Sequence, residues 1–152
     1  MTLRLTLGEV FDKNRTLKPA ERVAWLQKNA TAGLLYFLKL ALTPDVTWLV
    51  SEGTPEYRKI KGKDRPGAQS SDLFRELRRM YVFLKGGGDA LTQEKRNKLF
   101  ASVLEGIDEH EVALLVAVKD RKFEKQYACT KKLVEETFPG LLAVPFSVKF
   151  IR

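Results

Sequence analysis

The helical spacing of apolar residues runs through most of the chain and constrains the fold more than any other feature. Between Ala30 and Leu42, large apolar side chains cover almost the whole circumference of a helix, at Leu34, Leu35, Phe37, Leu38 and Leu40. A helix that is apolar on most sides belongs in the interior of a domain. The sequence therefore predicts an all-α fold, a single compact multi-helix bundle built around residues 30–42.

Start and stop signals divide the chain into about seven helices. Gly86-Gly87-Gly88 suits a helix end, because glycine accepts left-handed backbone. Thr92, Asp108 and Thr130 are predicted N-caps, and Glu111 completes an Asp-x-x-Glu capping pattern. We expect a helix ending near Lys13, one starting at Pro19, one over 30–42, one from Ser71 or Asp72 to Lys85, and one after each of the three N-caps.

Two segments lack regular helical spacing. Residues 51–70 combine glycine and proline with Arg58, Lys59, Lys61, Lys63 and Arg65, which predicts a long, flexible basic loop within the domain. Residues 141–152 alternate partly between apolar and polar and are rich in valine and phenylalanine, which predicts an extended tail. No repeat is visible, and we expect residues 1–152 to form one helical domain.

The charge balance narrows the choice of partner. Lysine and arginine outnumber aspartate and glutamate by 27 to 19, for a formal net charge of +8. Such an excess favours a polyanionic partner. The single cysteine fits a reducing compartment, no signal-peptide pattern is visible, and the longest apolar run, interrupted by Lys39, is too short to span a bilayer. We therefore expect a cytoplasmic protein that contacts no membrane.

The signatures of several enzyme classes are missing from the sequence. Gly86-Gly87-Gly88 is followed by Asp89, which would repel a phosphate. His110 is the only histidine, which excludes metal sites and acid–base schemes that need two. Cys129 lies at a predicted helix N-terminus, where the pKa of a thiol can fall, but the sequence indicates no base that would accept its proton. We expect neither catalytic residues nor a metal site nor a cofactor.

The last third of the chain carries an ordered series of signals. An acidic helix start at Asp108 leads to the basic run Lys119-Asp120-Arg121-Lys122, then to a short helix after Thr130, and then to Phe138-Pro139-Gly140-Leu141. This order resembles the end of the helical N-terminal DNA-binding domain of ATP-dependent DNA ligases. The resemblance implies a DNA-binding module without the nucleotidyltransferase domain, whose Lys-x-Asp-Gly nucleophile this chain lacks.

Three positions correspond to the Gly-Val-Ser-x-Lys helix of those ligases. Thr130 stands where they have serine and serves equally well as a cap, and Lys132 stands where they have lysine. Ala128 stands where they have glycine, and its Cβ disfavours the positive φ angles that glycine permits. We therefore expect the backbone of this turn to be less suited to contacting phosphate than that of the ligases.

A second resemblance covers nearly the whole chain. The segments 48–57 and 73–87 are similar to a family of small proteins from large tailed bacteriophages that has no assigned activity. This resemblance implies a phage protein that works in the host cytoplasm. It implies nothing about chemistry.

The function expected from these observations is non-catalytic binding of the double-stranded DNA backbone. The predicted contacts are cations on three helices and on the basic connection: Arg75, Arg78, Arg79, Lys95, Arg96, Lys98, Lys119, Arg121, Lys122, Lys125, Lys131 and Lys132. One alternative is an adaptor or host-takeover protein that binds a phage or host replication or transcription protein, such as a clamp or polymerase, through Val144–Ile151. Another is a virion component. Solvated helix faces would also account for the charges.

Overall fold

A computed structural model describes residues 5–44, 46–57 and 72–143. These residues form an all-α domain without strands, as predicted. Their elements, in chain order, are α1 (Leu7–Thr16), α2 (Pro19–Lys28), α3 (Ala32–Leu42), α4 (Leu73–Glu76), the 3-10 helix η1 (Leu77–Phe83), α5 (Gln93–Gly106), α6 (Glu109–Lys119), α7 (Phe123–Gln126), α8 (Lys131–Thr137) and the 3-10 helix η2 (Leu141–Ala143).

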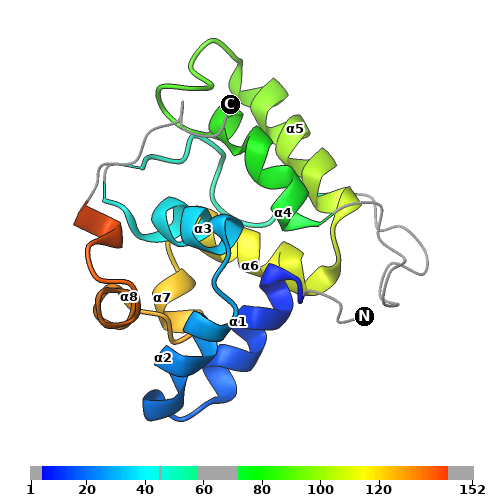
Figure 1. Ribbon diagram of the computed structural model, residues 1–152. Helices are drawn as coiled ribbons and strands as arrows, with labels where there is room; N and C mark the ends of the chain where they lie inside the picture. Colours follow the sequence, from blue (N-terminus) through cyan, green and yellow to red (C-terminus); the bar gives the residue numbers. More distant parts are fainter. Residues whose placement is uncertain (1–4, 45, 58–71, 144–152) are drawn as a thin grey trace.

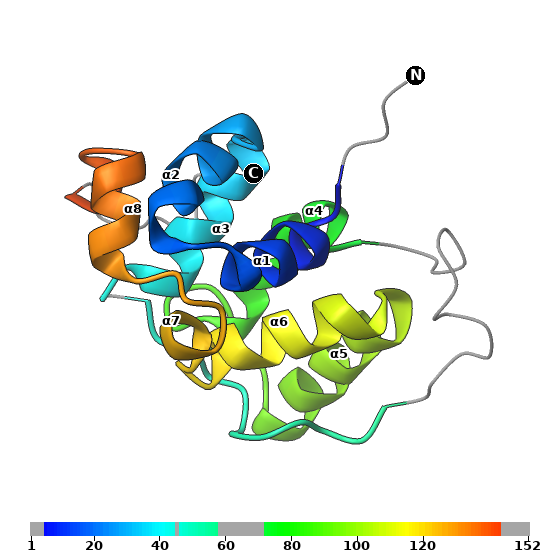
Figure 2. The ribbon, with the colours of Figure 1, turned by 90° about the horizontal axis from the view of Figure 1, so that it is seen from below.

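Helices α3 and α6 lie in the middle of the bundle (Figure 1). Helix α1 packs along α6, and α2 packs against α8. Seen from below, α7 and α8 lie at one end of the molecule and α4 and α5 at the other (Figure 2). Fully buried leucines and phenylalanines, among them Leu34, Phe37, Leu38 and Leu115, fill the space between the helices. The predicted central helix therefore does lie in the core.

The three predicted N-caps are confirmed. The side-chain oxygens of Thr92, Asp108 and Thr130 each accept a hydrogen bond from the backbone N–H three residues later, at 3.1, 2.9 and 3.1 Å. Each bond satisfies a donor that the first helical turn leaves without a partner. The local signals in the sequence are therefore sufficient to place the starts of α5, α6 and α8.

Glu111 does not complete the capping pattern of α6. Its side chain is fully buried and accepts hydrogen bonds from the backbone N–H of Gly8 at 3.4 Å and of Leu73 at 3.2 Å. These groups belong to the first turns of α1 and α4, so one carboxyl group joins the N-termini of two helices to a third. Burial raises the pKa of Glu111 from 4.5 to about 8, and Asp108 and Asp72 add to the shift.

The helix predicted from Ser71 or Asp72 to Lys85 is instead the short α4 followed by the 3-10 helix η1. The end of η1 bonds to another segment: Leu49 N–H donates to the Phe83 carbonyl at 2.8 Å, and Lys85 N–H donates to the Thr47 carbonyl at 2.9 Å. The chain then folds back on η1, where a Cβ on Gly88 would lie 1.8 Å from the Val82 oxygen. Bonds to partners distant in sequence therefore replace those of a regular helix.

The sequence did not predict helix α7. Phe123 opens it and is buried in an aromatic cluster, with ring centroids 5.1 Å from Phe11 and 5.8 Å from Phe37. The segment between the basic connection and α8 is therefore anchored in the core through Phe123.

Two predicted irregular segments fall largely outside the described residues. The described part of the basic loop, residues 51–57, contains no helix, and residues 58–70 lie outside. The predicted extended tail differs at its start, because Leu141–Ala143 forms the 3-10 helix η2, and residues 144–152 lie outside. Among the described helices, none has the length and apolar character needed to cross a bilayer.

Candidate functional site

The predicted DNA contacts fall into two groups at opposite ends of the molecule (Figures 1 and 2). One group lies on α4, η1 and α5. The other follows the chain from the end of α6 through α7 to the start of α8, and its exposed cations, Arg121, Lys122, Lys125, Lys131 and Lys132, are called the connection cluster below. Within the described part of the chain, the predicted contacts therefore form two separate basic surfaces.

Arg96 is not available for a surface contact, so its prediction as a DNA ligand is wrong. The residue is only 6% exposed, and its Nη2 donates to the carbonyl oxygens of Gly88 and Leu91, both at 2.8 Å. Its Nη1 donates to Gln93 Oε1 at 3.0 Å. The guanidinium therefore holds the turn that precedes α5.

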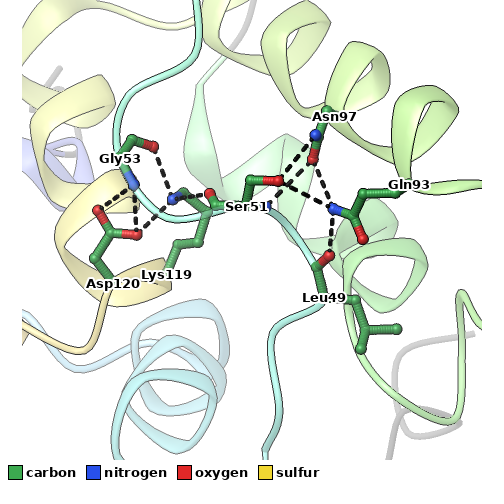
Figure 3. A network of polar contacts seen from close by, with 7 residues as sticks. All are labelled: Leu49, Ser51, Gly53, Gln93, Asn97, Lys119 and Asp120. Carbon is green, nitrogen blue, oxygen red and sulfur yellow. Dashed lines mark hydrogen bonds and ion pairs between the residues drawn. The ribbon is translucent and has the colours of Figure 1, made fainter.

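Lys119 is likewise buried, and its prediction as a DNA ligand is wrong. Its side chain is 0% exposed, and Nζ donates to the carbonyl oxygens of Ser51 and Gly53 at 2.8 and 2.9 Å and to Asp120 Oδ1 (Figure 3). Asp120 in turn accepts from the backbone N–H of Gly53 at 3.1 Å. Two adjacent residues at the end of α6 thus hold the chain at 51–53.

The same segment is held by α5. Gln93 Nε2 donates to the Leu49 carbonyl at 2.8 Å, and Asn97 Nδ2 donates to Ser51 Oγ at 3.1 Å (Figure 3). Further along, the Tyr57 hydroxyl donates to Glu109 Oε2 at 2.8 Å. Hydrogen bonds from side chains of α5 and α6 therefore hold residues 49–57 against these two helices.

The surface formed by α4, η1 and α5 is partly neutralised. Three of its cations face an acidic side chain about one turn away, in the pairs Arg75–Asp72 at 3.9 Å, Arg79–Glu76 at 3.4 Å and Lys98–Glu94 at 3.2 Å. Arg78 and Lys95 are exposed. Because each pair lowers the local positive potential, this surface is the weaker candidate for holding a polyanion.

The connection cluster is less neutralised. Lys122, Lys125, Lys131 and Lys132 are exposed, and none forms a salt bridge with another described residue. Arg121 differs, because its Nη2 donates to the Val46 carbonyl. The acidic side chains nearby bond elsewhere or form no salt bridge with these four lysines: Glu124 Oε2, for example, accepts from the backbone N–H of Lys131 at 3.1 Å.

Two turns with positive φ angles shape the connection cluster. Helix α6 ends at Lys119, and Arg121 in the turn that follows has φ 61°, where Lys122 N–H donates to the Ala117 carbonyl at 2.8 Å. Helix α7 ends at Gln126, and Ala128 in the turn that follows has φ 51°. The expectation that Ala128 would avoid this conformation is wrong, because the turn between α7 and α8 holds it in the left-handed region that glycine usually occupies.

Replacing Ala128 with glycine should stabilise the protein. Glycine removes the steric cost of the left-handed conformation but gains freedom in the unfolded chain, so we expect a net increase in the free energy of unfolding of about 0.5–1 kcal/mol. Ala24→Gly is the control, because Ala24 is exposed within α2 and glycine there should cost about 1 kcal/mol. Urea denaturation measures both, and a loss of stability in Ala128→Gly would contradict the account of this turn.

A pocket of about 270 Å³ opens beside the connection cluster, between α2 and α8. Two cations line it, Arg22 from α2 and Lys132 from α8, together with Ala128, Thr130 and Glu136. The sequence analysis did not select Arg22. No local signal marks it, because its proximity to α8 arises only from the packing of α2 against α8.

The structure also places Cys129 and His110, the two side chains that the sequence raised as candidates for chemistry. Cys129 is 0% exposed, and burial raises the pKa of its thiol to about 12, so it stays protonated and inaccessible despite its place before α8. His110 is exposed, and its Nδ1 lies 2.8 Å from Asp12 Oδ2. No group of three or more metal-binding side chains occurs among the residues that the structure describes.

Comparison with known proteins assigns the sequence to a family. No curated protein matches the sequence at a significant level. A protein-family model described as a family of unknown function, DUF6433, matches residues 9–125, which run from α1 into α7. The match stops before Ala128, Thr130 and Lys132, so it does not include the ligase-like turn or α8. Because it covers well over half of the sequence, the chain belongs to the family of unknown function DUF6433.

Proposed function

We propose that the protein is a non-catalytic phage accessory protein that binds the backbone of duplex DNA, without sequence preference, through the connection cluster. The main support is that four exposed lysines, Lys122, Lys125, Lys131 and Lys132, lie along a chain segment with glycine-like turns and form no salt bridge with described residues. Lysines contact phosphates as point charges and read no base sequence. The expected target is therefore the phosphate backbone.

The similarity to ligase N-terminal domains supports the same proposal. The position of their glycine is occupied by Ala128 with a positive φ angle, the position of their serine by the N-cap Thr130, and the position of their lysine by the exposed Lys132. The backbone and side-chain features that the resemblance implies thus occur together at one turn. The likeness to tailed-phage proteins supports an infected host cell as the setting of this activity.

The overall positive charge of the chain also favours DNA binding. Residues 58–71 carry five lysines and arginines against one aspartate, so much of the net charge of +8 comes from outside the described residues. A positive protein approaches a polyanion faster and keeps a weak, sequence-independent affinity for it. The charges of the connection cluster would determine which surface faces the DNA.

Fluorescence anisotropy with labelled duplexes tests the proposal. Two duplexes of unrelated sequence, each prepared intact and with a nick, should bind with similar affinity. If four phosphates are neutralised, the affinity should fall about a hundredfold between 50 and 200 mM salt. The proposal fails if no salt-sensitive binding is seen to any duplex. A strong preference for one sequence would also contradict it, because contacts to phosphates carry no base information.

A further inference from the structure

We infer that the pocket between α2 and α8 holds one phosphate group of the DNA backbone between Arg22 and Lys132. This inference rests on the proposed function and names a contact within it. The two side chains come from helices distant in sequence and line the same opening. A phosphate that entered it would meet cations from both helices.

Arg22 is held in position by α1. Its Nε donates to the backbone carbonyl of Asn14 at 3.1 Å, and neither terminal nitrogen donates to another described residue. The planar guanidinium keeps these two nitrogens in a fixed arrangement that suits a phosphate. Because Arg22 is half-buried, less side-chain freedom has to be lost on binding than for a fully exposed arginine.

The same asparagine fixes the opposite wall of the pocket. Asn14 is fully buried, and its Nδ2 donates to the carbonyl oxygens of Tyr127 at 3.0 Å and Ala128 at 3.5 Å. One residue of α1 therefore positions both the guanidinium of Arg22 and the left-handed turn before α8. Through these contacts Asn14 fixes the two sides of the pocket relative to each other.

The rest of the lining favours a single small anion. Pro19, Ala128 and Leu133 contribute apolar surface, which strengthens the attraction between an entering phosphate and the two cations. The two cations and the one carboxylate, that of Glu136, leave the lining with a formal net charge of +1, which matches the single negative charge of a backbone phosphate. A volume of about 270 Å³ is large enough for a phosphate and its ester oxygens.

Salt-dependent DNA binding of Arg22→Gln tests the inference. Losing one phosphate contact should weaken binding about tenfold at low salt and should reduce the slope of log affinity against log salt by about one. Lys28→Gln is the matched control, because Lys28 is an exposed cation of α2 that does not line the pocket. Thermal melting of each variant shows that it remains folded.

The double variant Arg22→Gln/Lys132→Gln distinguishes a shared phosphate from two separate ones. If both side chains hold the same phosphate, the slope should fall by about one in the double variant rather than by two. A fall of two, or an Arg22→Gln slope equal to that of Lys28→Gln, would overturn the inference while leaving the proposed function intact. Absence of DNA binding by the unaltered protein would instead reject the proposed function.

Discussion

Replacing Lys119 with methionine is expected to lower the free energy of unfolding by about 3–5 kcal/mol. The substitution keeps most of the volume but removes the ammonium group that Ser51, Gly53 and Asp120 share. The side chain of Asp120 is only 5% exposed, so its carboxylate would stay buried after losing its cationic partner. The two backbone carbonyls would also lose their donor.

Lys122→Met is the matched control for this variant. Lys122 is exposed and lies three residues further along the chain, so its replacement should change stability by no more than about 0.5 kcal/mol. In DNA binding the ranking should reverse, with a folded Lys119→Met variant keeping its affinity and Lys122→Met losing part of it. Urea denaturation and anisotropy supply the two measurements. Equal stability of the two variants would show that the buried contacts of Lys119 do not hold the 49–57 segment.

The stability of the protein is expected to fall as the pH rises from about 5 to 8. The pKa of Glu111 is near 8 in the folded state and near 4.5 when the residue is exposed. Between these values the folded protein binds the proton and the unfolded chain releases it, so each added pH unit costs the folded state up to about 1.4 kcal/mol. Below the lower pKa both states are protonated and the effect vanishes.

The physical cause lies in the surroundings of Glu111. Its carboxyl group is excluded from water, which favours the neutral form most strongly, and the negative charge of Asp108 acts in the same direction. The N–H groups of Leu73 and Gly8 favour the ionised form, but less strongly than burial opposes it, and Asp72 has the smallest effect. Ionisation of this buried carboxyl group should therefore destabilise the folded state at the junction of α1, α4 and α6.

Glu111→Gln should remove most of this pH dependence. An amide cannot ionise, although its NH₂ group would face either the Gly8 or the Leu73 N–H and cost about 1–3 kcal/mol at low pH. Urea denaturation at pH 5, 6, 7 and 8 should give a falling series for the unaltered protein and a nearly flat one for the variant. The same slope in both would show that another group controls the pH response.

The sequence is sufficient for the parts of the fold that depend on local chemistry. Thr92, Asp108 and Thr130 were recognisable as caps because each lies just before an apolar repeat of helical spacing. The break of the predicted 72–85 helix was not recognisable, because the bonds from Leu49 and to Thr47 come from a distant segment. The helix propensity of residues 72–85 carries no information about hydrogen bonds to a segment that is distant in sequence.

The candidate site likewise has some features that the sequence shows and others that depend on how the helices pack. Lys119 and Lys122 have the same chemistry and neighbouring positions in the basic connection, yet one is buried and the other exposed. Arg22 approaches α8 only because α2 packs there. A sequence shows which cations are present, but the packing of the helices decides which of them reach the surface together.

The salt dependence of duplex binding by two charge-matched triple variants tests the central claim most directly. Lys122, Lys125 and Lys131 are replaced by glutamine in one, and the exposed Lys13, Lys28 and Lys85 in the other, so both carry the same net charge. We expect the slope of log affinity against log salt to fall by about two to three units in the first variant and to change little in the second. Equal slopes in the two variants would contradict the proposal that the connection cluster contacts the DNA.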